Sequence, residues 1–372
     1  MIIQELELID YRNYSHAHTE LDSSLNIIVG GNAVGKTNLL ESVRILSLGS
    51  SYRASSDREV IRWGCDQAII HCRIVRRGKS YQMDFQIHRN GQKRIRVNQV
   101  ERQGHGEPEG LVVAVLFSPD DLKIVKEGPE YRRDYIDQVL IQISSKYAYF
   151  RKRYLRTLTQ RNSLLKSLMG ERKNLDTLEA WDQYLAEAAS HIYRMRRAGI
   201  EKIQKLANRR MREISPQENL QISYTPNFEL DLSEDGKQVC QAFLQQLKQE
   251  REEDIARGIT SFGPHRDELV LTVSDIDLRT YGSQGQQRTA ALALRMAEID
   301  FLREELEVTP ILLLDDVMSE LDKERRESLM RLLRDDMQCL LTTTNISYFD
   351  PQILTSQTVL EIKNGTIRRG GL

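Results

Sequence analysis

The sequence predicts an α/β fold in which a mainly helical lobe is inserted between two halves of a core domain. Three observations predict it. A short apolar stretch, Leu25 to Val29, leads through a glycine-containing loop into a helical pattern. Two other apolar runs, Leu111 to Phe117 and Ile311 to Leu314, have the composition of strands buried on both faces. The chain between them is helical from about Leu122 to Gly258. We therefore expect a core made of residues 1–121 and 259–372.

The composition is that of an ordinary globular protein, with 372 residues, 40% of them hydrophobic and 29% charged. The four cysteines (Cys65, Cys72, Cys240 and Cys339) lack metal-ligand spacing, which predicts reduced thiols. The N-terminus lacks the basic segment followed by an apolar one that is typical of a signal peptide. The apolar runs are too short to span a bilayer. We expect a cytoplasmic protein without a membrane partner.

The glycine-containing loop fits the phosphate-binding pattern G-x-x-x-x-G-K-[ST] between a strand and a helix. In such a loop, backbone N–H groups and the helix dipole bind phosphate, the lysine reaches the β- and γ-phosphates, and the hydroxyl binds magnesium. The sequence therefore predicts an ATP site. Its residues are Gly30, Gly31, Asn32, Ala33, Val34, Gly35, Lys36 and Thr37.

Flanking segments complete the N-terminal half. Ile2 to Leu8 alternates as a strand does, and Tyr11 to Tyr14 forms a polar turn. A helix is expected over Asn38 to Leu48, and a small antiparallel sheet over Gln67 to Val97. Within that sheet, Asn90-Gly91 predicts a two-residue hairpin turn. The hairpin is basic, through Arg89, Lys93, Arg94 and Arg96. A charged edge strand and a nucleic-acid contact are both compatible with these residues.

Two basic stretches lie in the helical lobe. Ser144 to Gly170 contains seven positive residues and no acidic one, and Arg194 to Arg212 contains eight against the single Glu201. Charged helices are usually only solvated, but two in one lobe beside an ATP site favour a phosphate-backbone partner. The candidate DNA-binding residues are Lys146, Arg151, Lys152, Arg153 and Arg156. A short strand is expected over Leu220 to Tyr224, and no heptad pattern is long enough for an extended coiled coil.

The last third returns to the α/β pattern. Strands are expected over Leu269 to Val273 and Ile276 to Leu278, and Ser283 is placed as the N-cap of a helix reaching Leu306. The apolar run that starts at Ile311 ends in Asp315-Asp316. Carboxylates at the tip of a buried strand need a cation or water. We therefore expect Asp315 to bind Mg²⁺ together with Thr37, and Asp316 to activate the attacking water.

These motifs, in this order, resemble the ATP-binding-cassette (ABC) heads of the chromosome-maintenance and DNA-repair ATPases. Ser319 to Asp322 is similar to the D-loop of those proteins. Four segments resemble the RecF family of recombination mediators specifically: Leu116 to Leu122, Arg132-Arg133, Phe262 to Asp267 and Gly282 to Thr289. The resemblance implies an ABC-type P-loop ATPase head with an inserted helical lobe and no long coiled coil.

The resemblance also implies a mechanism. In this superfamily the signature of one subunit closes over the ATP of another, so Ser283, Gly285 and Gln286 would act in trans within an ATP-dependent homodimer. The implied partners are gapped DNA and the mediator proteins RecR and RecO. Arg12 is placed similarly to a phosphate-contacting arginine in related heads. Two departures, Asp316 in place of the usual Glu and Thr342 to Thr344 in place of a switch His, predict slow hydrolysis.

Other interpretations remain open. A transporter ATPase subunit would use the same core, although the basic lobe and the missing switch His argue against it. An ATP-switched scaffold could bind protein rather than DNA through the basic lobe. Phe262 to Asp267 could be a structural turn, with His265 and Arg266 in an internal ion pair, or a DNA contact.

Overall fold

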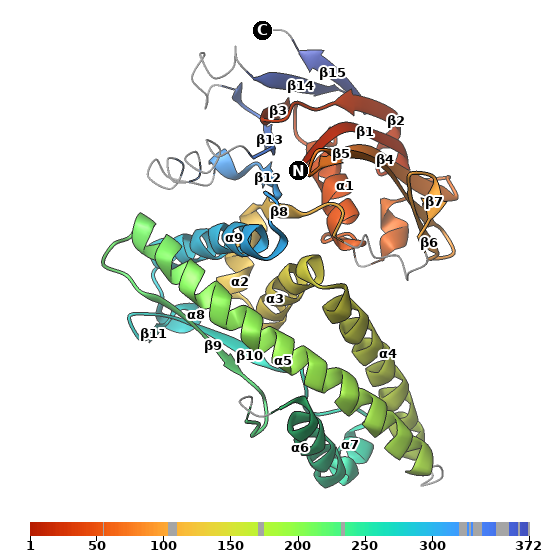
Figure 1. The fold of residues 1–372 in the computed structure, drawn as a ribbon, viewed down its shortest axis with the longest axis vertical. Coiled ribbons are helices and arrows are strands. Elements are labelled where there is room, and N and C mark those ends of the chain that lie inside the picture. Colours follow the sequence, from red (N-terminus) through yellow and green to blue (C-terminus); the bar gives the residue numbers. More distant parts are fainter. Residues whose placement is uncertain are drawn as a thin grey trace. The chain divides into compact units, whose positions relative to one another are not determined.

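The computed structural model (Figure 1) describes residues 1–54, 56–102, 110–169, 175–231, 235–319, 326, 329, 337–346, 357–363 and 365–370. They form two compact units. The first comprises Met1–Asp121 and Arg295–Leu372, and the second comprises Leu122–Leu294. The expected D-loop residues from Glu320 to Asp322 lie outside the described residues.

The second unit is larger than the sequence indicated. It begins at Leu122, but it continues past residue 258 to Leu294. The reason is strand pairing: β10 (Glu268–Val273) pairs antiparallel with β9 (Leu220–Thr225), so a boundary at 258 would cut through a hydrogen-bonded sheet. This pairing places the segment in the helical lobe rather than in the core.

The first unit contains an antiparallel sheet with the strand order β2-β1-β4-β5-β6-β7. In β4 and β5 fully buried residues alternate with less buried ones, as expected of a sheet with one face on the core. Their bounds are β1 (Ile2–Tyr11), β2 (Tyr14–Glu20), β4 (Gln67–Arg76), β5 (Lys79–His88), β6 (Lys93–Val97) and β7 (Val100–Glu101).

A second sheet in this unit has the order β15-β14-β3-β13-β12-β8, parallel except for β15 at its edge. The strands β12 and β13 are buried throughout, which explains their continuous apolar sequences. The bounds are β3 (Leu25–Val29), β8 (Ala114–Phe117), β12 (Ile311–Asp315), β13 (Cys339–Thr343), β14 (Thr358–Lys363) and β15 (Thr366–Gly370).

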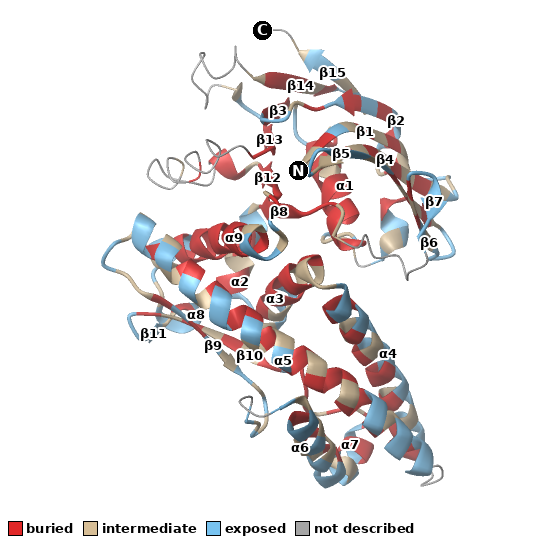
Figure 2. Cartoon of the chain, viewed as in Figure 1, coloured by how far each residue is buried: buried red, intermediate tan, exposed pale blue. Residues whose placement is uncertain are grey.

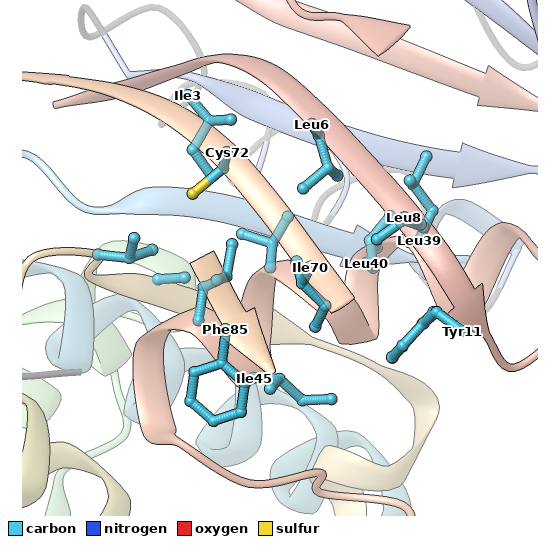
Figure 3. Close-up of a cluster of buried hydrophobic side chains, with 14 of the residues drawn as sticks. Ile3, Leu6, Leu8, Tyr11, Leu39, Leu40, Ile45, Ile70, Cys72 and Phe85 are labelled. Atoms are coloured by element: carbon cyan, nitrogen blue, oxygen red, sulfur yellow. The ribbon is translucent and has the colours of Figure 1, made fainter. Parts of the chain in front are cut away.

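Helix α1 (Lys36–Leu48) shares one buried hydrophobic cluster with strands of both sheets. Figure 3 shows Leu39, Leu40 and Ile45 of this helix facing Ile70 and Phe85 of the antiparallel sheet. Figure 2 shows the same helix buried along much of its length. Because the phosphate-binding loop precedes α1, this packing fixes the loop to both sheets.

The second unit is mainly helical, with a three-stranded sheet of order β11-β10-β9. Helices α4 and α5 pack against each other. They have 24 and 40 residues, so no long coiled coil extends from the described part of this unit. The helices are α2 (Leu122–Lys126), α3 (Pro129–Ile143), α4 (Ser145–Leu168), α5 (Leu175–Ile214), α6 (Gly236–Gln249), α7 (Arg251–Arg257) and α8 (Leu278–Tyr281). Helix α9 (Gln284–Leu306) contains the division between the units.

Local expectations differ from the structure in three places. The β5–β6 connection has four residues rather than two, because the turn closes from His88 to Gly91 and His88 bonds to Gln92. The apolar run from Leu111 becomes a strand only at Ala114. Strand β11 (Ile276–Asp277) ends early because the Asp277 side chain caps α8. Among the described helices, none is both long and apolar enough to cross a membrane.

Candidate ATP-binding site

The phosphate-binding loop lies between β3 and α1, at the carboxyl end of a central parallel strand. Gly35 adopts φ 116°, and a Cβ there would lie 2.7 Å from the Tyr14 hydroxyl. A Cβ on Gly30 would lie 2.8 Å from the carbonyl oxygen of Ile362. Both positions therefore require glycine. Ala33 also has a positive φ, 60°, so the loop has the curled backbone that turns N–H groups toward an anion.

Lys36 is held inside this loop. Its Nζ donates to the carbonyl oxygens of Gly30 at 2.9 Å and Gly31 at 2.7 Å. Burial lowers the pKa of Lys36, while Asp316 and Asp315 oppose that shift. The lysine is thus a cation within the loop, flanked by the two acidic residues at the end of β12.

The expected magnesium ligands are in contact. The Thr37 hydroxyl donates to Asp315 Oδ1 at 3.0 Å, and Thr342 donates to the same oxygen at 2.9 Å. Burial raises the pKa of Asp315, and these two hydrogen bonds work against the increase. A hydroxyl and a carboxylate that already face each other form an oxygen donor set suited to Mg²⁺.

Asp316 follows the end of β12 and adopts φ 53°, a left-handed conformation that is uncommon outside glycine. Its N–H donates to the Thr342 hydroxyl at 2.9 Å. Thr342 therefore contacts both acidic residues, one through its proton and one through its oxygen lone pair. In the sequence, the only signal for Thr342 is that Thr342 to Thr344 stand where related ATPases have a switch His.

The turn between β1 and β2 braces the loop. Asn13 Nδ2 donates to the Val34 carbonyl at 2.8 Å, and the Tyr14 hydroxyl donates to the Gly35 carbonyl at 2.9 Å. Neither contact could be found from the sequence, because the partners are 21 residues apart. These bonds fix the carbonyl side of the loop, which leaves its N–H groups for phosphate.

Arg12 occupies an ion pair in this structure. Its Nη2 and Nε bond to both carboxylate oxygens of Glu41 at 2.7 and 2.9 Å, and its Nη1 donates to the Glu59 carbonyl at 2.9 Å. Glu41 is fully buried on α1 and is a residue that the sequence analysis missed. Arg53 is a second residue that the sequence analysis missed: its Nη1 donates to Asn38 at 3.1 Å, beside the start of α1.

The signature segment begins α9. The Gln286 N–H donates to Ser283 Oγ at 3.2 Å, and the Ser283 N–H donates to Gln286 Oε1 at 3.0 Å. Ser283 is therefore the N-cap of the helix, as the sequence predicts, and Gln286 completes a capping box. Ser283 and Gly285 are exposed. A capped helix start with exposed small residues is a suitable anion site.

Comparisons with known proteins agree with this geometry. The family model for the RecF/RecN/SMC N terminal domain matches residues 2–364. A protein named DNA replication and repair protein RecF, from Halothermothrix orenii, is 40% identical over 372 residues, covering 99% of each chain. This chain belongs to the RecF family.

Solved structures extend the likeness to the fold. A structure described as the recombination mediator protein RecF-ATP in the RecFOR pathway is 33% identical, with a TM-score of 0.91, and covers 99% of this chain and 97% of that one. An SMC head domain from Pyrococcus furiosus is 15% identical, with a TM-score of 0.52, and covers 100% and 96% of the two chains; it shares the fold alone. The expected ABC-type ATPase head is confirmed, and the chain is an ATPase of this family.

The candidate DNA-binding residues of this RecF-family chain have different surroundings. Lys146, Lys152 and Arg156 are exposed on α4. Arg151 instead pairs with Asp137 at 2.7 Å, and Arg153 pairs with Glu187 at 2.7 Å. Part of the positive charge that suggested a DNA partner is therefore neutralised within the lobe.

Two other arginines of the basic stretches are structural. Arg161 is fully buried, with Nε 2.7 Å from Asp182 and Nη1 2.7 Å from Asp254. Arg196 is buried beside Asp137, at 2.8 Å. Burial opposes ionisation of Asp137, but Arg196 and Arg151 outweigh it and lower its pKa. These residues hold helices of the lobe together.

The Phe262 to Asp267 segment is a largely buried turn from which Arg266 is exposed, and His265 is not in an ion pair with a carboxylate among the described residues. Its Nδ1 lies 2.7 Å from the Tyr154 hydroxyl, and burial lowers its pKa to about 4, so the ring is neutral at pH 7. The buried ion is Asp267, which accepts hydrogen bonds from Tyr224 and from the N–H of Asn227.

Proposed function

We propose that this chain is an ATP-dependent, DNA-binding recombination mediator that acts in DNA repair and replication maintenance. Relatives with near-complete coverage are named DNA replication and repair proteins, and similar solved structures carry ATP and are assigned to the RecFOR pathway. The observation that best supports ATP binding is the geometry of the phosphate-binding loop. Lys36 is held inside the loop, and the Thr37 hydroxyl contacts Asp315.

ATP is the switch in this proposal. Lys36 compensates the charge of the β- and γ-phosphates, and the loop N–H groups cradle them. Thr37 and Asp315 would hold Mg²⁺, which neutralises phosphate charge when bound. Asp316 accepts a proton from the attacking water. Arg12 as a phosphate contact remains a prediction, and such a contact requires its guanidinium to leave Glu41.

Dimerisation completes the site. Ser283 and Gly285 lie at an exposed helix start, and Gln286 holds that start in shape, so the signature is available to the γ-phosphate of a second subunit. ATP then forms part of a homodimer interface, and ATP binding favours assembly by mass action. Slow hydrolysis by the short Asp316 carboxylate releases the dimer from DNA.

The proposed substrate is gapped DNA, with RecR and RecO as protein partners in the cytoplasm. The supporting cations are the exposed Lys146, Lys152 and Arg156 on α4. The ion pairs of Arg151 and Arg153 favour a second candidate, an ATP-switched scaffold whose α4 face binds protein. Salt dependence separates the two, because phosphate contacts release counterions.

The test measures binding to gapped DNA by fluorescence polarisation, with and without ATP, across a series of salt concentrations. The proposed function predicts ATP-dependent affinity with a steep salt slope, and loss of the ATP effect in Lys36→Ala. ATP-independent binding, or a flat salt slope, would contradict it. Adding RecR or RecO to the DNA-bound protein tests the partner assignment separately.

A further inference from the structure

An almost fully exposed tryptophan stands on the first unit. Trp63 is 97% exposed, in the connection between a 3-10 turn (Asp57–Val60) and β4. The connection is fixed by backbone hydrogen bonds: Arg62 N–H donates to the Asp10 carbonyl at 2.8 Å, and Cys65 N–H donates to the Arg62 carbonyl at 3.1 Å. Gly64 supplies the positive φ, 83°, that the turn needs. The turn is therefore ordered, and the Trp63 indole projects from it into solvent.

The two chain segments that meet at this turn are rich in positive charge. Between Asp57 and Asp66 and between His88 and Val97, six lysines and arginines stand against three carboxylates. Arg89 is tied to the turn, because its N–H donates to the Asp66 carbonyl at 2.8 Å and its Nε donates to the Cys65 carbonyl at 3.1 Å. Arg89, at the start of the β5–β6 connection, is therefore held against the Trp63 turn.

Some of these charges are compensated and others are not. Lys93 pairs with Asp57 at 2.5 Å, and Arg62 lies 3.8 Å from Asp10. Arg58 and Arg94 are exposed and have no ion-pair partner in the part of the chain that the structure describes. The Lys93–Asp57 pair holds the start of β6, which carries Arg94, against the 3-10 turn that carries Arg58, so both arginines favour an anion in this part of the unit.

The surroundings distinguish between classes of partner. A protein interface places its tryptophan within an apolar core that excludes water. Among the described residues of the first unit, the other large exposed apolar side chain is Val100 on β7. A flat aromatic ring among cations, without an apolar surround, fits a nucleobase stacked on the ring with its phosphates on the arginines.

We propose that the Trp63 turn is a contact for single-stranded DNA, in which the indole stacks on an unpaired base and the arginines at positions 58, 89 and 94 bind the adjoining phosphates. This inference rests on the proposed DNA-binding function and adds that unpaired nucleotides are bound by the first unit. Stacking needs a free base face, which a continuous duplex does not offer.

The turn is also joined to the phosphate-binding loop. The Arg12 N–H donates to the Val60 carbonyl at 2.7 Å, just before the turn. The neighbouring Asn13 donates to the Val34 carbonyl of the loop at 2.8 Å. The DNA contact and the ATP site therefore share the β1–β2 turn as a common support.

Fluorescence of the full-length protein tests the stacking directly. The chain has two tryptophans, so Trp181→Phe leaves Trp63 as the only indole. Because a stacked base quenches indole emission, oligothymidylate should quench Trp63, with saturation at the concentration at which polarisation reports binding. An abasic oligonucleotide of equal length supplies the phosphates without bases and should leave the emission nearly unchanged. Normal DNA binding without quenching overturns the proposal and leaves the proposed function standing.

Affinity provides the second test. Trp63→Ala should weaken single-strand binding by about 5- to 150-fold, which corresponds to about 1–3 kcal/mol per stacked base, with little change for blunt duplex. Trp63→Phe should restore most of the affinity, and Val100→Ala serves as an exposed apolar control. Unchanged single-strand affinity in Trp63→Ala overturns the inference. Normal DNA binding with impaired assembly in light scattering would make the turn a protein interface. If neither the wild type nor any variant binds DNA, the proposed function is wrong as well.

Discussion

A single hydroxyl links the two acidic residues at the end of β12. Thr342 donates to Asp315 and accepts from the Asp316 N–H. Thr342→Val keeps the side-chain shape and leaves that N–H without its acceptor, at a cost of about 1–3 kcal/mol of folding stability. We expect a larger Mg²⁺ requirement for ATP hydrolysis, with partial rescue in Thr342→Ser. Equal magnesium dependence in Thr342→Val and wild type would refute this positioning role.

Lys36 is the cation within the loop, so its removal leaves the phosphate charge uncompensated. We expect Lys36→Ala to abolish ATP binding and hydrolysis, and Lys36→Arg to keep some binding without hydrolysis, because the larger guanidinium does not fit the same position. Equilibrium dialysis with ATP and phosphate release measure both properties. Lys363→Ala, an exposed lysine on the neighbouring strand β14, is the matched control. Unchanged hydrolysis in Lys36→Ala would rule out the phosphate-loop assignment.

His265 predicts a pH dependence of stability. Burial lowers its pKa to about 4 from 6.5, so below pH 6.5 the unfolded chain binds a proton that the folded chain does not. This group alone therefore reduces stability as the pH falls from 6.5 toward 4. Burial also raises the pKa of neighbouring Asp267 to about 6, which acts in the opposite direction over a similar range.

Comparison with a variant isolates the histidine. Between pH 7 and pH 4.5, the unfolding free energy of His265→Gln relative to wild type should shift in the variant's favour by about 2–3 kcal/mol. Urea unfolding at the two pH values measures the difference. A pH-independent difference would mean that His265 titrates normally in the folded protein.

At the scale of elements, strongly patterned segments were predictable. The strand Leu25–Val29 and the Ser283 helix start appear where composition and capping rules put them. The length of the β5–β6 turn could not be predicted. Asn90-Gly91 also fits a four-residue connection, which is closed by the hydrogen bond between His88 and Gln92. The end of the helical lobe was misplaced because a six-residue strand, β10, pairs across a long sequence separation.

The basic stretches on α4 and α5 show the limit of charge patterns. Arg161 and Arg196 count as positive residues in the sequence, yet both are buried against aspartates. A helix shows which residues share a face, but their acidic partners come from other elements, so sequence cannot separate a solvated arginine from a structural one. Four cations of α4 remain exposed: Lys146, Lys152, Arg156 and Lys166.

Helix α4 therefore gives a sharper DNA test than the whole stretch. Replacing Lys146, Lys152 and Arg156 by glutamine should weaken binding to all DNA sequences and lower the slope of log affinity against log salt by about 0.9 for each phosphate that is no longer neutralised. Replacing Lys237 and Lys248 on α6 provides an exposed-charge control. Arg151 is left intact, because it is one of the two arginines that neutralise the buried Asp137. Wild-type affinity and slope in the triple variant would show that this face is only solvated.

At the scale of the whole molecule, the two halves of the proposed site lie far apart in the sequence. The phosphate loop and its acidic partners could be predicted because their chemistry is local, as Thr37 against Asp315 illustrates. The bracing residues Asn13 and Tyr14 and the Arg12 partner Glu41 could not be predicted, because ordinary polar residues become part of the site only through the fold. The action of Ser283 in trans depends on a second copy and remains a proposal.

The central claim is that ATP holds two copies together through a composite site, and light scattering with two opposed variants tests it most directly. Ser283→Arg leaves the phosphate loop untouched and puts a bulky cation where the second subunit's γ-phosphate would dock. Asp316→Asn removes the proposed base while keeping both half-sites. With ATP, Ser283→Arg should bind nucleotide and stay monomeric, whereas Asp316→Asn should remain dimeric long after the wild type has dissociated. Normal ATP-dependent dimerisation of Ser283→Arg would contradict the account.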